Sequence, residues 1–194
     1  MKRTIFFTAA FLSFLGLMES RAQNMQNNRN MEKLKLTEEW DKTFPKSDKV
    51  DHSKVTFVNR FGITLAADLY VPKIAVADKF PAIAVSGPFG AVKEQSSGLY
   101  AQTLAERGFL TIAFDPSFTG ESSGQPRSVA SPDINTEDFS AAVDYLATRP
   151  DVDAERIGIL GICGWGGFAI NAAANDTRIK ATVASTMYDI SRAN

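Results

Sequence analysis

Apolar and polar residues follow two different patterns along the chain from about residue 50 onward. Residues 54–59 and 64–71 alternate in polarity on either side of the turn Arg60-Phe61-Gly62, which predicts an antiparallel hairpin. Pro72 is expected to end the second strand, because proline cannot donate a hydrogen bond to a neighbouring strand. Beyond residue 80 the apolar runs become continuous, at residues 81–86, 109–114, 156–162 and 179–185. Such runs are typical of strands that are covered on both faces.

Segments with helical spacing of apolar residues separate these runs, at residues 99–107, 136–148 and 168–174. Because strands alternate with helices, we expect an α/β fold, a three-layer αβα sandwich whose sheet is mostly parallel with an N-terminal antiparallel hairpin. Right-handed crossovers bring the carboxyl ends of parallel strands to one edge of the sheet. The loops at residues 87–98, 115–128 and 163–167 should meet there, and we expect the functional site at that edge.

The first 22 residues have the pattern of a secretory signal. Lys2 and Arg3 precede an apolar run from Ile5 to Met18, and Ser20-Arg21-Ala22 offers small residues for cleavage after Ala22. A membrane anchor is the alternative, but a helix that spans a bilayer needs roughly 20 apolar residues. We therefore expect an exported protein, periplasmic or secreted, with no stable membrane association after cleavage of the signal peptide.

Residues 23–49 form a polar segment between this signal, residues 1–22, and the domain, residues 50–194. The Asn-rich beginning of the segment is typical of a flexible leader. Residues 36–44 could form a short helix that packs Trp40 and Phe44 on the domain.

Composition and charge exclude several kinds of partner. The formal net charge of the 194 residues is −1, so no basic field favours nucleic acid or an anionic membrane. The sequence contains no metal-ligand cluster, and we expect neither a metal ion nor a cofactor. Cys163 is the single cysteine, so no disulfide can form within the chain. An unpaired thiol in an oxidising compartment is a liability unless it is buried or has a use.

The stretch RIGILGICGWGG, residues 156–167, predicts a buried strand that ends at a sharp bend before a helix. A nucleophile at such a bend has a strained backbone, and the positions two before and two after it must be small. Gly161 meets the first requirement, and the N–H of Gly164 could stabilise an oxyanion. Gly166 would let the helix pack close to the strand. Cys163 at the bend is a nucleophile, a packing residue or part of a phosphate-binding turn.

These residues resemble the α/β-hydrolase superfamily, in particular its dienelactone-hydrolase-like and Xaa-Pro-peptidase-like bacterial members. The similar segments are VDAERIGILGIC, the SGPFG loop after the first parallel strand, and DPSFTGESSG after the second. The resemblance implies that Cys163 is the nucleophile and that the backbone N–H of Gly164, with that of Phe89 or Gly90, forms the oxyanion hole. It implies hydrolysis of a small-molecule ester, lactone or peptide-like substrate by acyl transfer.

The sequence departs from the family pattern in two ways. Trp165 stands where a small residue is expected, and a second register places Trp165 itself at the nucleophile position, where indole has no such chemistry. The acid and the histidine of the triad are also absent, because His52 is the only histidine and precedes the first parallel strand. We expect His52 on the solvated surface, and Asp189 comes too early for the acid. A C-terminally truncated hydrolase domain, inactive alone, is therefore expected.

Two other interpretations stay open. In the first, the chain is a non-catalytic truncated fragment. Alternatively, Gly164-x-Gly166-x-x-Ala169 matches a dinucleotide-binding fingerprint, with Asp189 placed to hold a ribose, although that fingerprint normally lies in the first strand-helix unit.

Overall fold

The expected hairpin forms one side of a six-stranded sheet. The computed structural model describes residues 32–73 and 78–187, so the predicted signal peptide at residues 1–22 lies outside the described residues. Strand β1 (Val50–Val58) pairs with β2 (Thr64–Pro72) in antiparallel register, with Asn59 to Ile63 as the turn. Pro72 is the last residue of β2, as predicted. Within the described part of the chain, no helix is long and apolar enough to cross a membrane.

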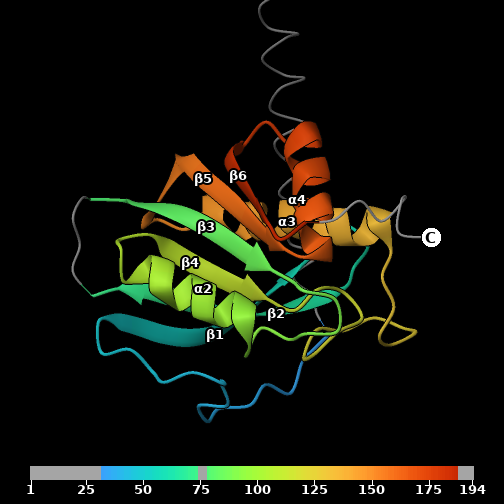
Figure 1. Cartoon of the computed structure of the whole chain (residues 1–194), viewed down its shortest axis with the longest axis horizontal. Coiled ribbons are helices and arrows are strands. Elements are labelled where there is room, and N and C mark those ends of the chain that lie inside the picture. Colours follow the sequence, from blue (N-terminus) through green and yellow to red (C-terminus); the bar gives the residue numbers. More distant parts are fainter. Residues whose placement is uncertain (1–31, 74–77, 188–194) are drawn as a thin grey trace, which may run out of the picture. The chain divides into compact units, whose positions relative to one another are not determined.

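The four continuous apolar runs form parallel strands at the centre and far side of the sheet (Figure 1). They are β3 (Phe80–Ser86), β4 (Leu110–Phe114), β5 (Val152–Ile162) and β6 (Ile179–Ser185). The strand order is β1-β2-β4-β3-β5-β6, in which β2 is antiparallel to both β1 and β4, and the neighbours among β4, β3, β5 and β6 are parallel. After β3 the chain adds β4 on one side of β3 and then β5 and β6 on the other side. Because these strands are parallel, the loops that follow β3, β4 and β5 share one edge of the sheet.

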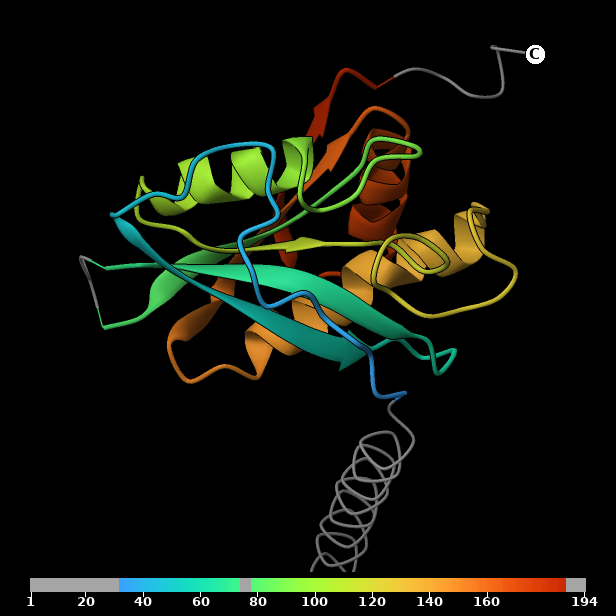
Figure 2. The ribbon, with the colours of Figure 1, turned by 90° about the horizontal axis from the view of Figure 1, so that it is seen from below.

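Helices cover both faces of this sheet, which confirms the predicted three-layer α/β fold. On one face α2 (Ser96–Ala105) packs Ala101 and Ala105 against Val85 and Leu160. On the other face α3 (Pro132–Ala147) and α4 (Gly164–Asn175) enclose the larger core with Phe139 and Phe168. Figure 2 shows α2 and α3 on opposite sides of the strands. Helix α4 begins earlier than its apolar spacing predicts, directly after the bend.

Residues 32–49 lie along the domain without the predicted short helix. Residues 36–44 are irregular, although Trp40 and Phe44 pack against each other, with ring centroids 5.7 Å apart. Side chains of the domain bind the backbone of this segment. The amide of Ser47 donates to Gln102 Oε1 at 3.2 Å, and the amide of Thr37 donates to Glu121 Oε1 at 2.7 Å. These tertiary bonds replace the intrahelical hydrogen bonds that a helix would have supplied.

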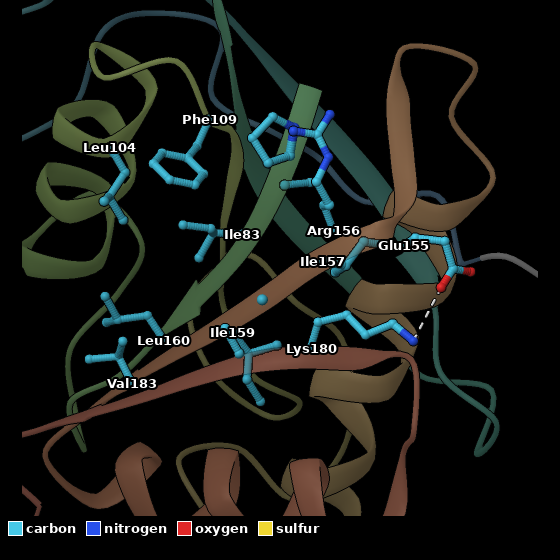
Figure 3. Close-up of a pocket in the computed structure, with 14 residues that line it drawn as sticks. Ile83, Leu104, Phe109, Glu155, Arg156, Ile157, Ile159, Leu160, Lys180 and Val183 are labelled. Carbon is cyan, nitrogen blue, oxygen red and sulfur yellow. Dashed lines mark ion pairs between the residues drawn. The ribbon is translucent and has the colours of Figure 1, made fainter. Parts of the chain in front are cut away.

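The face of the sheet that carries α2 is only partly covered. Beside α2 an apolar groove of about 330 Å³ runs over β3, β5 and β6. Figure 3 shows Ile83, Leu160 and Val183 projecting into it from the three strands, with Leu104 and Phe109 on the α2 side. Val183 is 52% exposed, and the only ion pair drawn at the groove, Glu155 with Lys180 at 3.3 Å, lies at one end. The groove contains no nucleophile and lies on the face of the sheet, away from the loop edge.

Candidate active site

The sharp bend falls at Cys163. Strand β5 ends at Ile162 and α4 begins at Gly164, so the whole reversal takes place at one residue. The backbone of Cys163 has φ 57° and ψ −123°, a conformation that residues with a Cβ rarely adopt. Trp165 is helical and 3% exposed. Of the two predicted registers, the geometry therefore matches the one that has Cys163 at the elbow.

Close backbone contact explains the small residue before the bend. A Cβ on Gly161 would overlap the carbonyl oxygen of Trp165, because the first turn of α4 folds back onto the end of β5. Gly166 allows a close approach to the end of β6 and the residues after it, since a Cβ there would lie 3.0 Å from that of Met187 and 3.3 Å from that of Ala184. The path of the chain at the elbow thus requires glycine at 161, and at 166 it leaves little room for a side chain.

The indole of Trp165 does not crowd the turn, contrary to the sequence-based expectation. The indole packs edge-on against Phe89 and Phe168, with ring centroids 4.6 Å and 5.2 Å away. Its Nε1 has no acceptor among the described residues. Gly87, directly after β3, lets that loop approach the elbow, because a Cβ there would overlap the Ile162 carbonyl oxygen and lie 2.9 Å from the Cβ of Trp165. The side chain of Trp165 is therefore accommodated among aromatic rings beside the turn.

The Cys163 side chain is half-buried and lies against the smaller core cluster that includes Ile162. Its backbone is fixed on both sides, because Cys163 donates to Ser185 O at 2.8 Å and accepts from the amide of Gly166 at 3.0 Å. The first bond ties the elbow to the end of β6. The strained residue is therefore held by the sheet and by its own helix.

The loop after β3 lies against the elbow. Ala91 donates to Pro88 O at 3.1 Å, which closes a turn with Phe89 and Gly90 at its centre, and Gly90 has φ 74°. The amides of Phe89 and Gly90 donate no hydrogen bond to another described residue. The ring of Phe89 lies on Gly164, where a Cβ would overlap it. This loop and the first residue of α4 are thus in contact, and the oxyanion hole that they are expected to form stays a prediction.

A buried ion pair joins the loops after β3 and β4. Asp115, the first residue of DPSFTGESSG, accepts from the amide of Lys93 at 2.8 Å and from its Nζ at 2.9 Å. Both side chains are fully buried. Burial lowers the pKa of Lys93, but the carboxylates of Asp115, Glu121 and Glu94 outweigh burial and raise it. Lys93 therefore stays charged and holds the two site loops together.

The sequence analysis missed this pair because lysine at position 93 has the pattern of a solvated loop residue. The aspartate that opens a family-like loop was the available signal, since a buried carboxylate needs a positively charged or hydrogen-bonding partner.

His52 is not on the solvated surface, and it does not reach the elbow. Its side chain is 13% exposed, and Nε2 lies 2.8 Å from Oδ1 of the buried Asp68, which also pairs with Lys42. His52 is on β1, four strand spacings from β5 in the sheet order, or roughly 19 Å at about 4.8 Å per spacing. Asp189 lies outside the described residues. The only histidine of the sequence thus cannot serve Cys163 as a base in this fold.

Comparisons with known proteins identify the same superfamily. Residues 62–194 match the model of the X-Pro dipeptidyl-peptidase (S15) family. An uncharacterized protein of Pseudomonas aeruginosa is 66% identical over 94% of this chain and 50% of its own length. The crystal structure of a hypothetical protein from that organism has a TM-score of 0.81 and 71% identity, over 83% of this chain and 50% of that one.

Among the more distant relatives are proteins that are named as hydrolases. A thiohydrolase, aneE, of Aspergillus aculeatus is 34% identical over 66% of this chain and 39% of its own length. The crystal structure of the α/β hydrolase GrgF from a Penicillium species has a TM-score of 0.62 and 28% identity, over 68% of this chain and 44% of that one. This chain spans about half the length of the curated relatives it matches.

Proposed function

Because the chain belongs to the X-Pro dipeptidyl-peptidase (S15) family, within the α/β-hydrolase superfamily, we propose that Cys163 is the nucleophile of an acyl-transfer reaction. The substrate class is a small-molecule ester, lactone or peptide-like compound. The observation that supports this most directly is the strained conformation of Cys163 before α4, whose first residue, Gly164, contacts the ring of Phe89 in the loop after β3. The thiohydrolase name of one relative supports acyl chemistry as well.

In the proposed reaction the sulfur of Cys163 forms a bond to the carbonyl carbon of the substrate. The negative charge that develops on the carbonyl oxygen is stabilised by the amide of Gly164 and by that of Phe89 or Gly90. The bond from the carbonyl carbon to the leaving oxygen or nitrogen then breaks, the leaving group takes a proton from water, and the thiol proton is released to solvent. An acyl thioester at Cys163 remains.

Hydrolysis of this thioester needs a base that activates water, and the base needs an orienting carboxylate. His52 is the only histidine in the sequence and is bound to Asp68 on β1. We therefore propose that this chain alone acylates but has negligible turnover. The comparisons match hydrolases, so acyl transfer is favoured over the dinucleotide-binding alternative.

The test is a time course of p-nitrophenyl acetate cleavage by the full chain. We expect one equivalent of nitrophenolate per chain, followed by turnover close to that of buffer, and loss of the burst in Cys163→Ala. Sustained turnover that disappears in Cys163→Ala would contradict the proposed inactivity and support the nucleophile. If Cys163 shows no burst and resists iodoacetamide until the protein is denatured, the thiol is a packing residue and the proposal is wrong.

A further inference from the structure

A second cavity lies among the loops at the carboxyl edge of the sheet. It has a volume of about 370 Å³ and is formed by the loop after β3, the loop after β4 and the first turn of α4. Its apolar walls are Phe89, Val92, Val129, Ala130 and Trp165. Small-molecule sites are concave, mostly apolar and about 300 Å³ or larger, so this cavity is at the small end of the range.

The cavity and the proposed catalytic centre share residues. Phe89 and Gly90 belong to the oxyanion turn, and Trp165 is two residues after Cys163. The ring of Phe89 also rests on Gly164, the residue after Cys163. Cys163 itself is not one of the walls, and its side chain packs against the smaller core cluster. The cavity therefore adjoins the elbow and the oxyanion turn without including the sulfur.

The wall supplied by the loop after β4 is held in a fixed shape. Phe118 and Ser128 have φ 73° and 60°, and the amide of Ser128 donates to Phe118 O at 2.8 Å. Arg127 Nη2 donates to Gly120 O at 2.7 Å. Non-glycine residues in this region of backbone space persist only where the surroundings over-determine them. The cavity is therefore preformed.

We propose that this cavity is the acyl-binding subsite of the Cys163 centre and that it selects aromatic or branched apolar acyl groups. The inference rests on the proposed function. Phe89 and Trp165, which pack edge-to-face with centroids 4.6 Å apart, supply an aromatic wall against which a single ring can pack. The volume suits a group of that size better than a peptide chain, and Thr119 and Ser128 add hydroxyl groups to the lining.

The first test compares acylation of Cys163 by p-nitrophenyl benzoate and p-nitrophenyl acetate. Each burst rate of the full chain is divided by the rate of a small free thiol with the same ester, which removes the intrinsic difference in reactivity. We expect the corrected benzoate-to-acetate ratio to be about ten or more, because burying a few extra carbons in an apolar pocket gives discrimination of this size. A corrected ratio near one would overturn the subsite.

Val129→Phe tests the position of the subsite, because Val129 is 39% exposed and a larger side chain there fills the cavity without entering the core. Ile170→Phe, at a 46% exposed position of α4 outside the cavity, is the matched control. We expect Val129→Phe to bring the corrected ratio close to one while the iodoacetamide rate of Cys163 stays unchanged, and Ile170→Phe to leave both unchanged. A Val129→Phe protein with the original ratio would contradict the proposed location.

A binding measurement separates failure of the subsite from failure of the nucleophile. Tryptophan fluorescence of the Cys163→Ala chain is titrated with methyl benzoate and with methyl acetate, since Trp165 is a wall of the cavity. Saturable binding of the benzoate alone, lost in Val129→Phe, supports the subsite even if Cys163 proves unreactive. Absence of benzoate binding overturns the subsite even if Cys163 gives a burst.

Discussion

Gly161 and Gly87 are the residues on which the elbow depends most directly, and they act differently. Gly161 makes room for the Trp165 carbonyl in the first turn of α4, whereas Gly87 makes room for the Ile162 carbonyl at the end of β5. Gly87 also has φ 107°, which L-residues with a side chain rarely adopt. The elbow therefore depends on a glycine of its own strand and on one that follows the neighbouring strand β3.

Gly161→Ala should destabilise the protein by about 2 kcal/mol or more, because the added methyl group overlaps the Trp165 carbonyl and backbone has to move. The free energy of unfolding from urea titration measures this. Gly167→Ala is the matched control in the same segment, because a Cβ there meets no atom within 4 Å and alanine favours the helix by up to about 1 kcal/mol. Equal effects of the two substitutions would contradict the overlap.

At the scale of elements, the loops after β3 and β4 are joined by charge rather than by apolar packing. Lys93→Met should leave Asp115 as a buried carboxylate with only amide donors, at a cost of about 3 kcal/mol in the free energy of unfolding. Lys180→Met is the control, because its ion pair with Glu155 is exposed and such pairs contribute about 0–1 kcal/mol. If Lys93→Met is as mild as Lys180→Met, the pair does not hold the loops.

Glu121 connects the same loop to the N-terminal segment and gives it a pH dependence. Burial raises the pKa of Glu121, but hydrogen bonds from Lys54, Lys93 and the Thr37 amide outweigh burial and lower it from 4.5 to about 2. The charged form is thus favoured in the folded state. Its contribution to stability is complete above pH 4.5 and is lost as the pH falls toward 2.

The difference in unfolding free energy between the wild type and Glu121→Gln should therefore be largest near pH 6 and should shrink between pH 4.5 and 2. Urea titrations at several pH values measure it, and the comparison removes the contribution of the other carboxylates. Protease should also cleave within residues 32–49 faster in Glu121→Gln, since Thr37 loses its charged acceptor. A difference that is constant with pH would rule out this role.

At the scale of the whole molecule, the uncovered groove of Figure 3 adjoins β6, whose outer edge has no partner among the described residues. Exposed apolar surface next to a free strand edge favours association between molecules. Val183→Lys should therefore lower self-association of the chain at high concentration, as sedimentation velocity would show. Ile170→Lys, an equally exposed apolar position on α4, should have a smaller effect. Identical behaviour of the two variants would contradict a role for the groove.

The sequence by itself determined the elements and the elbow, because both depend on short stretches of chain. Continuous apolar runs predicted the four parallel strands, and for residues 179–185 the predicted and observed bounds of β6 coincide. The glycines around Cys163 predicted the bend, since the required backbone approach involves residues within a few positions of each other. The prediction of a short helix at residues 36–44 was wrong, and in the structure the amides of Thr37 and Thr43 donate to distant acceptors, Glu121 Oε1 and Glu94 O.

Only the tertiary structure decided which distant residues meet. The strand order places β4 between β2 and β3, and no local periodicity specifies that order. It brings Lys93 to Asp115, and Gly87 to Ile162 and Trp165. It also forms the cavity beside the oxyanion turn from three loops. Patterns along a sequence describe which face of an element is apolar, whereas the partners of a buried charge or ring follow from how crossovers arrange the strands.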